Sequence, residues 1–340
     1  LHYFIEDTTS EYVVTKWREN RRMSYDTTFK RMAGFNLVGI SNAAFEDLLR
    51  TGEDAVTWCR GNGFLASTMM CCNRQCYLGP DTKRVGTDPR LCWRCRACRR
   101  TFGLRKGSFF EKSRLPISTI IRLIYAWAHE SGGKYSVLRQ QLSIRSNTTI
   151  VDGLNSMREI CADKFIREPI VIGGPGTIVQ IDKSLFGRRK YNRGRLVPQQ
   201  WVLGGIQHGT RQAFLVPVPR RNAATLVPII QAHVRPGTTI WTDGWGAYLA
   251  LAGVGYVHET VNHRLNWVNP VTGVNTQSIE SLWKDAKAKH KRLAGTSRNN
   301  LRSYLVEFLW RKRFGQTAEV FHNIMSHIRE SYPVSSHQSY

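Results

Sequence analysis

The stretch that most constrains the fold of this chain is residues 177–195, an apolar run followed by a basic loop. The β-branched residues Ile178, Val179 and Ile181 predict a buried strand, and Asp182 lies near its end. A carboxylate can hold a divalent ion while nearby cations neutralise phosphates, so the stretch indicates a metal site that faces a polyanion. The structural alternative is an acid that ends a strand before a solvated turn. The cations of the loop are Arg188, Arg189, Lys190, Arg193 and Arg195.

The charge of the chain indicates an anionic partner. Its 340 residues include 49 Lys and Arg against 25 Asp and Glu, a formal net charge of +24. This excess favours nucleic acid as the partner, with an anionic membrane surface second. No apolar run approaches the roughly 20 residues that span a bilayer, and the first residues lack a signal-peptide pattern. We therefore expect a soluble, intracellular protein, nuclear in a eukaryote and otherwise with the nucleoid in the cytoplasm.

Six of the eight cysteines lie between residues 71 and 98, which in an intracellular chain favours a metal over disulfides. Two ligand pairs separated by a loop rich in Gly, Pro and Asp predict a closed tetrahedral zinc site that stabilises a small ribbon. Cys71 could replace Cys72, and Cys92 could replace Cys98. The preferred ligands are Cys72, Cys76, Cys95 and Cys98.

The cysteine segment is also densely basic, which predicts that the ribbon lies on a phosphate backbone. A ribbon that contacts only protein is the alternative. The cations expected to contact DNA here are Arg94, Arg96, Arg99, Arg100, Arg105 and Lys106.

Apolar residues at helical spacing predict three short helices in residues 116–172, with Ser118 capping the first and residues 147–149 capping the third. Tight turns between short helices fit a helix-turn-helix module that enters a DNA groove. Any small helical bundle has the same pattern. Two further short helices are expected at residues 43–49, capped by Ser41 or Asn42, and at 53–59.

The Gly-Gly-Pro-Gly segment at residues 173–176 marks a boundary, after which the pattern becomes α/β. A strand, a hairpin, a crossover helix, a strand ending in Asp243 and a late helix bearing Glu280 form the element order of the ribonuclease H-like fold, a mixed sheet with flanking helices. We therefore predict an N-terminal helical segment, a zinc ribbon, a helical DNA-binding module and a ribonuclease H-like catalytic domain with C-terminal helices. Their bounds are 1–64, 65–115, 116–172 and 173–340.

Asp182, Asp243 and Glu280 occupy the places where such a fold gathers its acids. Phosphodiester chemistry needs hard oxygen ligands for two divalent ions, and Mg²⁺ or Mn²⁺ suits them. Lys284 and Lys287 follow Glu280 by four and seven residues, so they share its helix face and are expected to meet DNA phosphates.

Other polar residues near these acids receive no catalytic role. Asp285 and Glu307 are expected to be surface charges. His263 could hold a metal or a phosphate, but a loop histidine with ordinary partners is the preferred interpretation, and Asn275 is left without a role.

Three separate motifs carry a family resemblance: residues 181–195, residues 241–248, and residues 262–263 followed by 276–284. In this order they resemble the Merlin superfamily of DNA transposases and their bacterial insertion-sequence relatives. Residues 93–98 and 105–110 extend the likeness to roughly residues 65–315.

The resemblance implies a DDE catalytic triad at Asp182, Asp243 and Glu280, and recognition of terminal inverted repeats by the N-terminal zinc and helical parts. Two departures are a first cysteine pair with a wider gap than usual, and Asn275 where relatives often carry His. The expected function is that of a cut-and-paste transposase acting on double-stranded DNA as a dimer or larger assembly. A nuclease without strand transfer and a non-catalytic DNA-binding protein are the alternatives.

Overall fold

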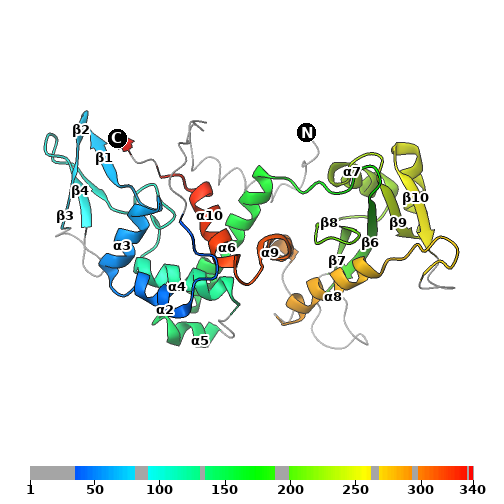
Figure 1. Ribbon diagram of the computed structural model, residues 1–340, viewed down its shortest axis with the longest axis horizontal. Helices are drawn as coiled ribbons and strands as arrows, with labels where there is room; N and C mark the ends of the chain where they lie inside the picture. The colour runs from blue at the N-terminus through cyan, green and yellow to red at the C-terminus, as the bar shows by residue number, and fades with distance from the viewer. Residues whose placement is uncertain are drawn as a thin grey trace. The chain divides into compact units, whose positions relative to one another are not determined.

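The structure is a computed structural model, and its described residues are 35–80, 91–130, 135–187, 199–261, 268–292, 298–334 and 337–339. The chain divides into two units, Leu1–Phe35 and Asn36–Tyr340, and the description below concerns the second. This unit is a mixed α/β fold with a five-stranded sheet, packed helices and a small cysteine-bearing segment (Figure 1). No helix in the described ranges is long and apolar enough to cross a membrane.

The five-stranded sheet is made of β6 (Ile178–Phe186), β7 (Gln200–Gln207), β8 (Ala213–Val218), β9 (Thr239–Asp243) and β10 (Val257–Val261). Its order is β10-β9-β6-β7-β8. β7 pairs antiparallel with β6 and β8, whereas β6, β9 and β10 run parallel. Parallel strands need a crossover, and the chain makes one through α7 (Ala223–His233) between β8 and β9. The sheet is therefore mixed, as the sequence predicts.

Helices cover both faces of this sheet (Figure 1). On one face α7 and the 3₁₀ helix η2 (Gly246–Val254) enclose a core that contains Val179 and Ile181. On the other face α8 (Gln277–Arg292) and α9 (Arg298–Phe314) pack over a core that contains Phe186. Because side chains alternate along a strand, β6 points its odd-numbered residues to the first core and its even-numbered residues to the second.

A helical layer is built around α6 (Asn147–Arg167), which spans 21 residues. α6 contacts α4 (Ile117–Ala128), α5 (Tyr135–Gln141), α9 and α10 (Val320–Ser331). The C-terminal helices therefore pack on residues 116–172 as well as on the sheet, and the sequence pattern gave no sign of this contact.

The expectation that Glu307 is a surface charge is wrong, because this residue is only 2% exposed. Its carboxylate lies 3.7 Å from Arg158 Nη1 and 3.0 Å from Arg311 Nε. Arg311 also donates to the carbonyls of Trp127 and Ala128 in the last turn of α4. A buried charge without partners is costly, and here the partners come from neighbouring helices that a single helix pattern cannot reveal.

The cysteine segment forms two small sheets. β1 pairs antiparallel with β2 and parallel with a strand near the C-terminus, β11 (His337–Ser339). β3, β4 and β5 form an antiparallel sheet of their own. The strands are β1 (Thr68–Cys71), β2 (Arg74–Gln75), β3 (Tyr77–Pro80), β4 (Leu91–Arg94) and β5 (Thr101–Gly103).

Two short helices precede this segment, α2 (Asn42–Leu48) and α3 (Gly52–Gly61). Ser41 caps α2 by accepting a hydrogen bond of 3.2 Å from the amide of Ala44, which confirms one of the two predicted caps. Thr51 and Asp54 form a reciprocal capping box on α3.

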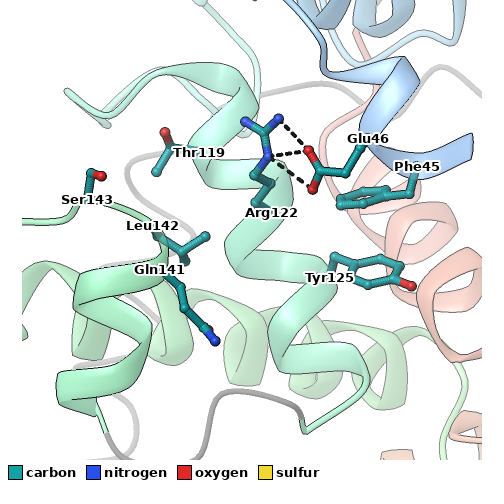
Figure 2. A pocket seen from close by; sticks show the side chains of 8 residues that line it. All are labelled: Phe45, Glu46, Thr119, Arg122, Tyr125, Gln141, Leu142 and Ser143. Atoms are coloured by element: carbon teal, nitrogen blue, oxygen red, sulfur yellow. Dashed lines mark hydrogen bonds and ion pairs between the residues drawn. The ribbon is translucent and has the colours of Figure 1, made fainter. Parts of the chain in front are cut away.

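A cleft of about 510 Å³ lies among α2, α4 and the end of α5 (Figure 2). Arg122 of α4 crosses it and donates to the Glu46 carboxylate at 2.7 and 3.1 Å, and to the Leu49 carbonyl at 3.0 Å. The rings of Phe45 and Tyr125 stack beside this pair at 4.0 Å. Since the Arg122 and Glu46 charges satisfy each other, the cleft joins two helices rather than offering a free charge to a ligand.

Two predicted caps are wrong by one or two residues. The N-cap of α4 is Pro116, which makes no side-chain bond, and Ser118 is buried within the helix. The N-cap of α6 is Ser146, whose hydroxyl accepts from the amide of Thr148 at 3.1 Å. Ser146 has the extended backbone that capping requires, so the helix begins directly after it.

His327 makes the stability of this layer depend on pH. Its Nδ1 accepts a hydrogen bond of 2.9 Å from Trp310 Nε1, and burial lowers its pKa to about 3. The unfolded chain binds a proton at this residue below about pH 6.5, whereas the folded chain does not, so stability falls as pH falls from about 6.5 toward 3.

We predict that His327→Asn, which keeps an acceptor for Trp310, removes this contribution. Between about pH 7.5 and about pH 5.5 the wild type should lose about 1 kcal/mol more unfolding free energy than the variant, measured by urea denaturation. An equal loss in the two proteins would contradict the assignment. His208→Asn, in an exposed turn, is the control.

Candidate active site and cysteine cluster

Two acids stand side by side on neighbouring parallel strands. Asp243 is the last residue of β9, as predicted. The prediction that Asp182 lies near the end of its strand is wrong, because β6 continues past it to Phe186 through its pairing with β7. The register pairs Ile181 with Thr242, so the two acids are the next step of the same ladder. Neighbours in register point to the same face of a sheet. The structure thus brings together two of the three acids that the sequence singled out.

The Asp182 carboxylate has one side-chain hydrogen-bond donor and one nearby cation. Oδ2 accepts a hydrogen bond of 2.9 Å from Trp283 Nε1, and Oδ1 lies 3.9 Å from Lys183 Nζ. Burial raises the pKa of Asp182, and the nearby Asp243 charge raises it further, while Lys183 and Trp283 act in the opposite direction. The Asp182 side chain is still 23% exposed, so the carboxylate is partly enclosed but can be reached by an ion.

A matched ladder fixes α8 on β6. Three alternate residues of β6 contact α8 at steps of four residues, because two residues of a strand and four of a helix both advance about 6 Å. The amide of Ile279 donates to Gln180 Oε1 at 3.1 Å, Trp283 binds Asp182, and Lys287 Nζ donates to Ser184 Oγ at 2.6 Å. The face of β6 that carries Asp182 is therefore the face on which α8 lies.

Gly204 makes room for the central rung of this ladder. It pairs with Asp182 across β6 and β7, and a Cβ built on it would lie 2.6 Å from Trp283 Cη2. Any larger residue would push the indole off the sheet and away from the carboxylate. The glycine is thus required by close packing rather than by a turn.

Glu280 lies in the first turn of α8, three residues before Trp283 and so on the same side of the helix. Its side chain is exposed, and its Oε1 accepts from Thr276 Oγ1 at 3.3 Å. In the described part of the chain, the ligand atoms of three acids do not come within 4.8 Å of one another. The structure therefore places Glu280 on the helix that packs over Asp182 without bringing its carboxylate into one cluster with the two aspartates.

The sequence reasoning missed Lys183, which lies beside both acids. Its ammonium contacts Asp243 Oδ2, and its side chain is only 8% exposed. The rings of Trp245 and Tyr248 lie 5.1 and 5.4 Å from it. The buried Tyr248 hydroxyl has no hydrogen-bond partner in the described structure, and burial with the charges of both acids raises its pKa well above the usual value. In the sequence, the role of Lys183 could have been inferred only from its position next to Asp182.

Four cysteine sulfurs form the second candidate site. Those of Cys71, Cys72, Cys95 and Cys98 all lie within 4.8 Å of one another. The separation is 3.7 Å for the first two and 3.4 Å between Cys71 and Cys98. Sulfurs at about 2.3 Å from a zinc ion lie about 3.8 Å apart at tetrahedral angles. The donor set and its spacing thus fit a metal such as zinc.

The backbone prepares both halves of this cluster. Cys72 and Asn73 have positive φ angles of 52° and 54° and form the two-residue turn of the β1–β2 hairpin. This turn allows adjacent cysteines to present both sulfurs to one point. In the second half, the amides of Cys98 and Ala97 donate to the Cys95 sulfur and lower its pKa to about 7. A thiol that ionises near neutral pH is a ready metal ligand.

Three of the four preferred zinc ligands, Cys72, Cys95 and Cys98, lie in the cluster. Cys71, which the sequence analysis considered only as a replacement for Cys72, takes the place predicted for Cys76. Cys76 is buried next to it, and burial, with Cys95 nearby, raises the pKa of the Cys76 thiol. Cys92 lies buried in β4, outside the four sulfurs. The sequence spacing could not separate Cys71 from Cys76, because the choice depends on the turn at Cys72.

The predicted DNA contacts fall into three groups. Arg96, Arg99, Arg100 and Lys284 are exposed. Arg105 is committed to the protein, since its Nη1 donates to the carbonyls of Ser113 and Leu115 at 2.9 and 2.7 Å. The half-buried residues are Arg94, Lys106, which lies 5.0 Å from the Phe102 ring, and Lys287, whose pKa burial lowers.

Several other predictions concern residues outside the described ranges, namely His263 and the loop cations Arg188, Arg189, Lys190, Arg193 and Arg195.

Asn275 lies within the described residues and has a structural role. Its Oδ1 accepts from Gln180 Nε2 at 3.2 Å and from the Gln277 amide at 3.3 Å, at the start of α8.

Comparison with known proteins places the acids within a recognised domain type. Residues 173–313 match the model of the ISXO2-like transposase domain. An uncharacterized transposase-like protein of Haemophilus influenzae is 29% identical over 100 residues, which are 29% of this chain and 80% of that protein. These similarities support an insertion-sequence transposase family, and β6, β9 and α8 with their acids lie inside the matched residues.

The cysteine cluster yields a direct test of the ligand set. We predict that Ser variants of Cys71, Cys72, Cys95 and Cys98 each lower zinc content from about one ion per chain to near zero, because three thiolates leave the site open. Metal analysis of the purified variants measures this.

Cys92→Ser and Cys161→Ser are the matched controls, because both residues are buried outside the cluster. Zinc retained in Cys71→Ser but lost in Cys76→Ser would instead support the ligand set preferred from the sequence.

Proposed function

We propose that this chain is a cut-and-paste DNA transposase that binds terminal inverted repeats, cleaves the element ends and joins the 3′ hydroxyls to target DNA. The observation that carries the proposal is the pair Asp182 and Asp243, adjacent on neighbouring parallel strands, beneath a helix that bears Glu280. The match of residues 173–313 to a transposase domain supports the same chemistry.

The proposed fold of this part is ribonuclease H-like. Three successive antiparallel strands, a crossover helix and two further parallel strands support it, as does the late helix on the acid-bearing face. Within the transposases we place the chain in the Merlin superfamily, on the motifs around the three acids. The cysteine segment is proposed to be a structural zinc ribbon.

The donors at the acid pair fit a hard cation. They are carboxylate oxygens, and the buried, unpartnered Tyr248 hydroxyl lies close enough for both acids to raise its pKa. Two Mg²⁺ or Mn²⁺ ions, when bound, would activate the attacking oxygen and stabilise the leaving one. Asp182 and Asp243 would hold them, with Glu280 as the ligand from α8.

The remaining residues position these groups. Trp283 holds the Asp182 carboxylate through a hydrogen bond to Oδ2, and Gly204 leaves space for that indole. The exposed cations Arg96, Arg99, Arg100 and Lys284 are proposed to contact DNA phosphates, which fixes DNA in place without reading its sequence. Because two element ends must be held together, the active form is proposed to be a dimer or larger assembly on DNA.

The acid pair is tested by conservative substitution. Asp182→Asn and Asp243→Asn should each lower strand cleavage by about 10³-fold or more, since an amide cannot replace an anionic metal ligand. Cleavage is measured with Mg²⁺ on linear DNA that carries the ends of the element encoding the chain. Binding to those ends, measured by gel shift, should persist.

Asp285→Asn is the matched control, because this acid is exposed on the same helix as Glu280. It should cleave as the wild type does. Normal cleavage by Asp182→Asn would show that the site lies elsewhere.

Strand transfer separates a transposase from a nuclease of the same fold. We predict that the wild-type protein, incubated with pre-cut ends, supercoiled plasmid and Mg²⁺, yields joined products, because the 3′ hydroxyl can take the place of water as the attacking group. Products are read on agarose gels and by sequencing the junctions. Cleavage without any joined product would favour the nuclease, and end binding without either would favour a DNA-binding protein.

A further inference from the structure

We propose that Lys183 is a built-in cation that holds the acid pair together in the metal-free protein and must be displaced by the incoming divalent ion. The inference rests on the proposed function, because it assumes that Asp182 and Asp243 are metal ligands. On this proposal Lys183 controls how tightly the acid pair binds a divalent ion.

The position of the ammonium is the first argument. Lys183 Nζ contacts Asp243 Oδ2 and lies 3.9 Å from Asp182 Oδ1, so one cation bridges carboxylates from two strands. A divalent ion shared by the same two acids would have to lie between the same oxygens. Two cations cannot occupy that place together, since their repulsion at such distances amounts to several kcal/mol even at an effective dielectric constant near 20.

The enclosure of the ammonium is the second argument. Surface lysines are mobile and solvated, but this side chain is only 8% exposed. The rings of Trp245 and Tyr248 lie within 5.4 Å of it, at distances typical of a cation–π contact. Burying an ammonium is costly unless it is paired, so the pairing with the acids holds Lys183 in place.

The third argument is that Lys183 has a way out. Lys183 lies in β6 one residue after Asp182, so its side chain leaves the strand on the opposite face of the sheet. It reaches Asp243 around the end of β9, because Asp243 is the last residue of that strand. Trp245, which covers it, is 41% exposed, and added Cβ atoms on Gly244 and Gly246 would meet nothing within 4 Å. The flexible stem can therefore swing toward solvent beside an open turn.

The test measures Mn²⁺ binding directly, without DNA and without turnover. Lys183→Met keeps the apolar stem and removes the charge. We expect it to bind Mn²⁺ about tenfold tighter or more than the wild type in calorimetric titrations, because no internal cation has to leave. In the metal-free state the variant should melt at a lower temperature, since the two acids then repel each other, and saturating Mn²⁺ should raise its melting temperature more than that of the wild type.

Two further variants make the result decisive. Lys183→Arg keeps the charge and should stay close to the wild type in Mn²⁺ affinity, while Lys291→Met removes an exposed lysine of α8 that has no proposed role and should leave the Mn²⁺ affinity unchanged. Equal or weaker Mn²⁺ binding by Lys183→Met would overturn the inference and leave the proposed function standing. Failure of Mn²⁺ to bind the wild type and Lys183→Met alike would instead count against the metal site itself.

Discussion

The hydrogen bond between Trp283 Nε1 and Asp182 is the contact on which the arrangement of the site depends. It joins α8, the helix that carries Glu280, to β6, the strand that carries Asp182. A carboxylate on the buried face of a sheet loses hydration and needs a donor in return. The indole provides that donor while its ring fills the core between sheet and helix. One side chain thus gives both the packing energy and the polar partner, so α8 cannot shift along β6 without breaking both.

The same contact explains residues that have no chemistry of their own. Gly204 is small because the indole lies where its Cβ would be. Gln180 and Ser184 bind α8 one rung before and one rung after Asp182, which sets the register of the helix. Lys287 is consequently half-buried and hydrogen-bonded to Ser184, and its contact with DNA phosphates stays a prediction. Its spacing of seven residues from Glu280 did predict the side of α8 on which Lys287 lies, the side that faces β6.

Periodicity predicted most elements of the sheet closely, including β7 at its observed bounds and the strand that ends in Asp243, whereas the strand that carries Asp182 continues to Phe186, beyond its predicted end. It succeeded because strands and amphipathic helices are local patterns. It failed where the deciding partner is remote in sequence. Glu307 reads as a surface acid within α9, yet its partner Arg158 is on α6. The role of Cys71 depends on a positive φ at Cys72, and Lys183 owes its enclosure to aromatic residues after the next parallel strand.

The two candidate sites solve opposite electrostatic problems. At the cysteine cluster the anions are created by the site itself, since backbone amides already favour the thiolate of Cys95, and four soft sulfurs leave no position open. At the acid pair two neighbouring carboxylates repel each other when ionised, and a nearby cation offsets that repulsion. Lys183 provides that cation from within the chain. The first site is therefore suited to hold its ion permanently as part of the fold, whereas the role proposed for the second is to exchange one cation for another.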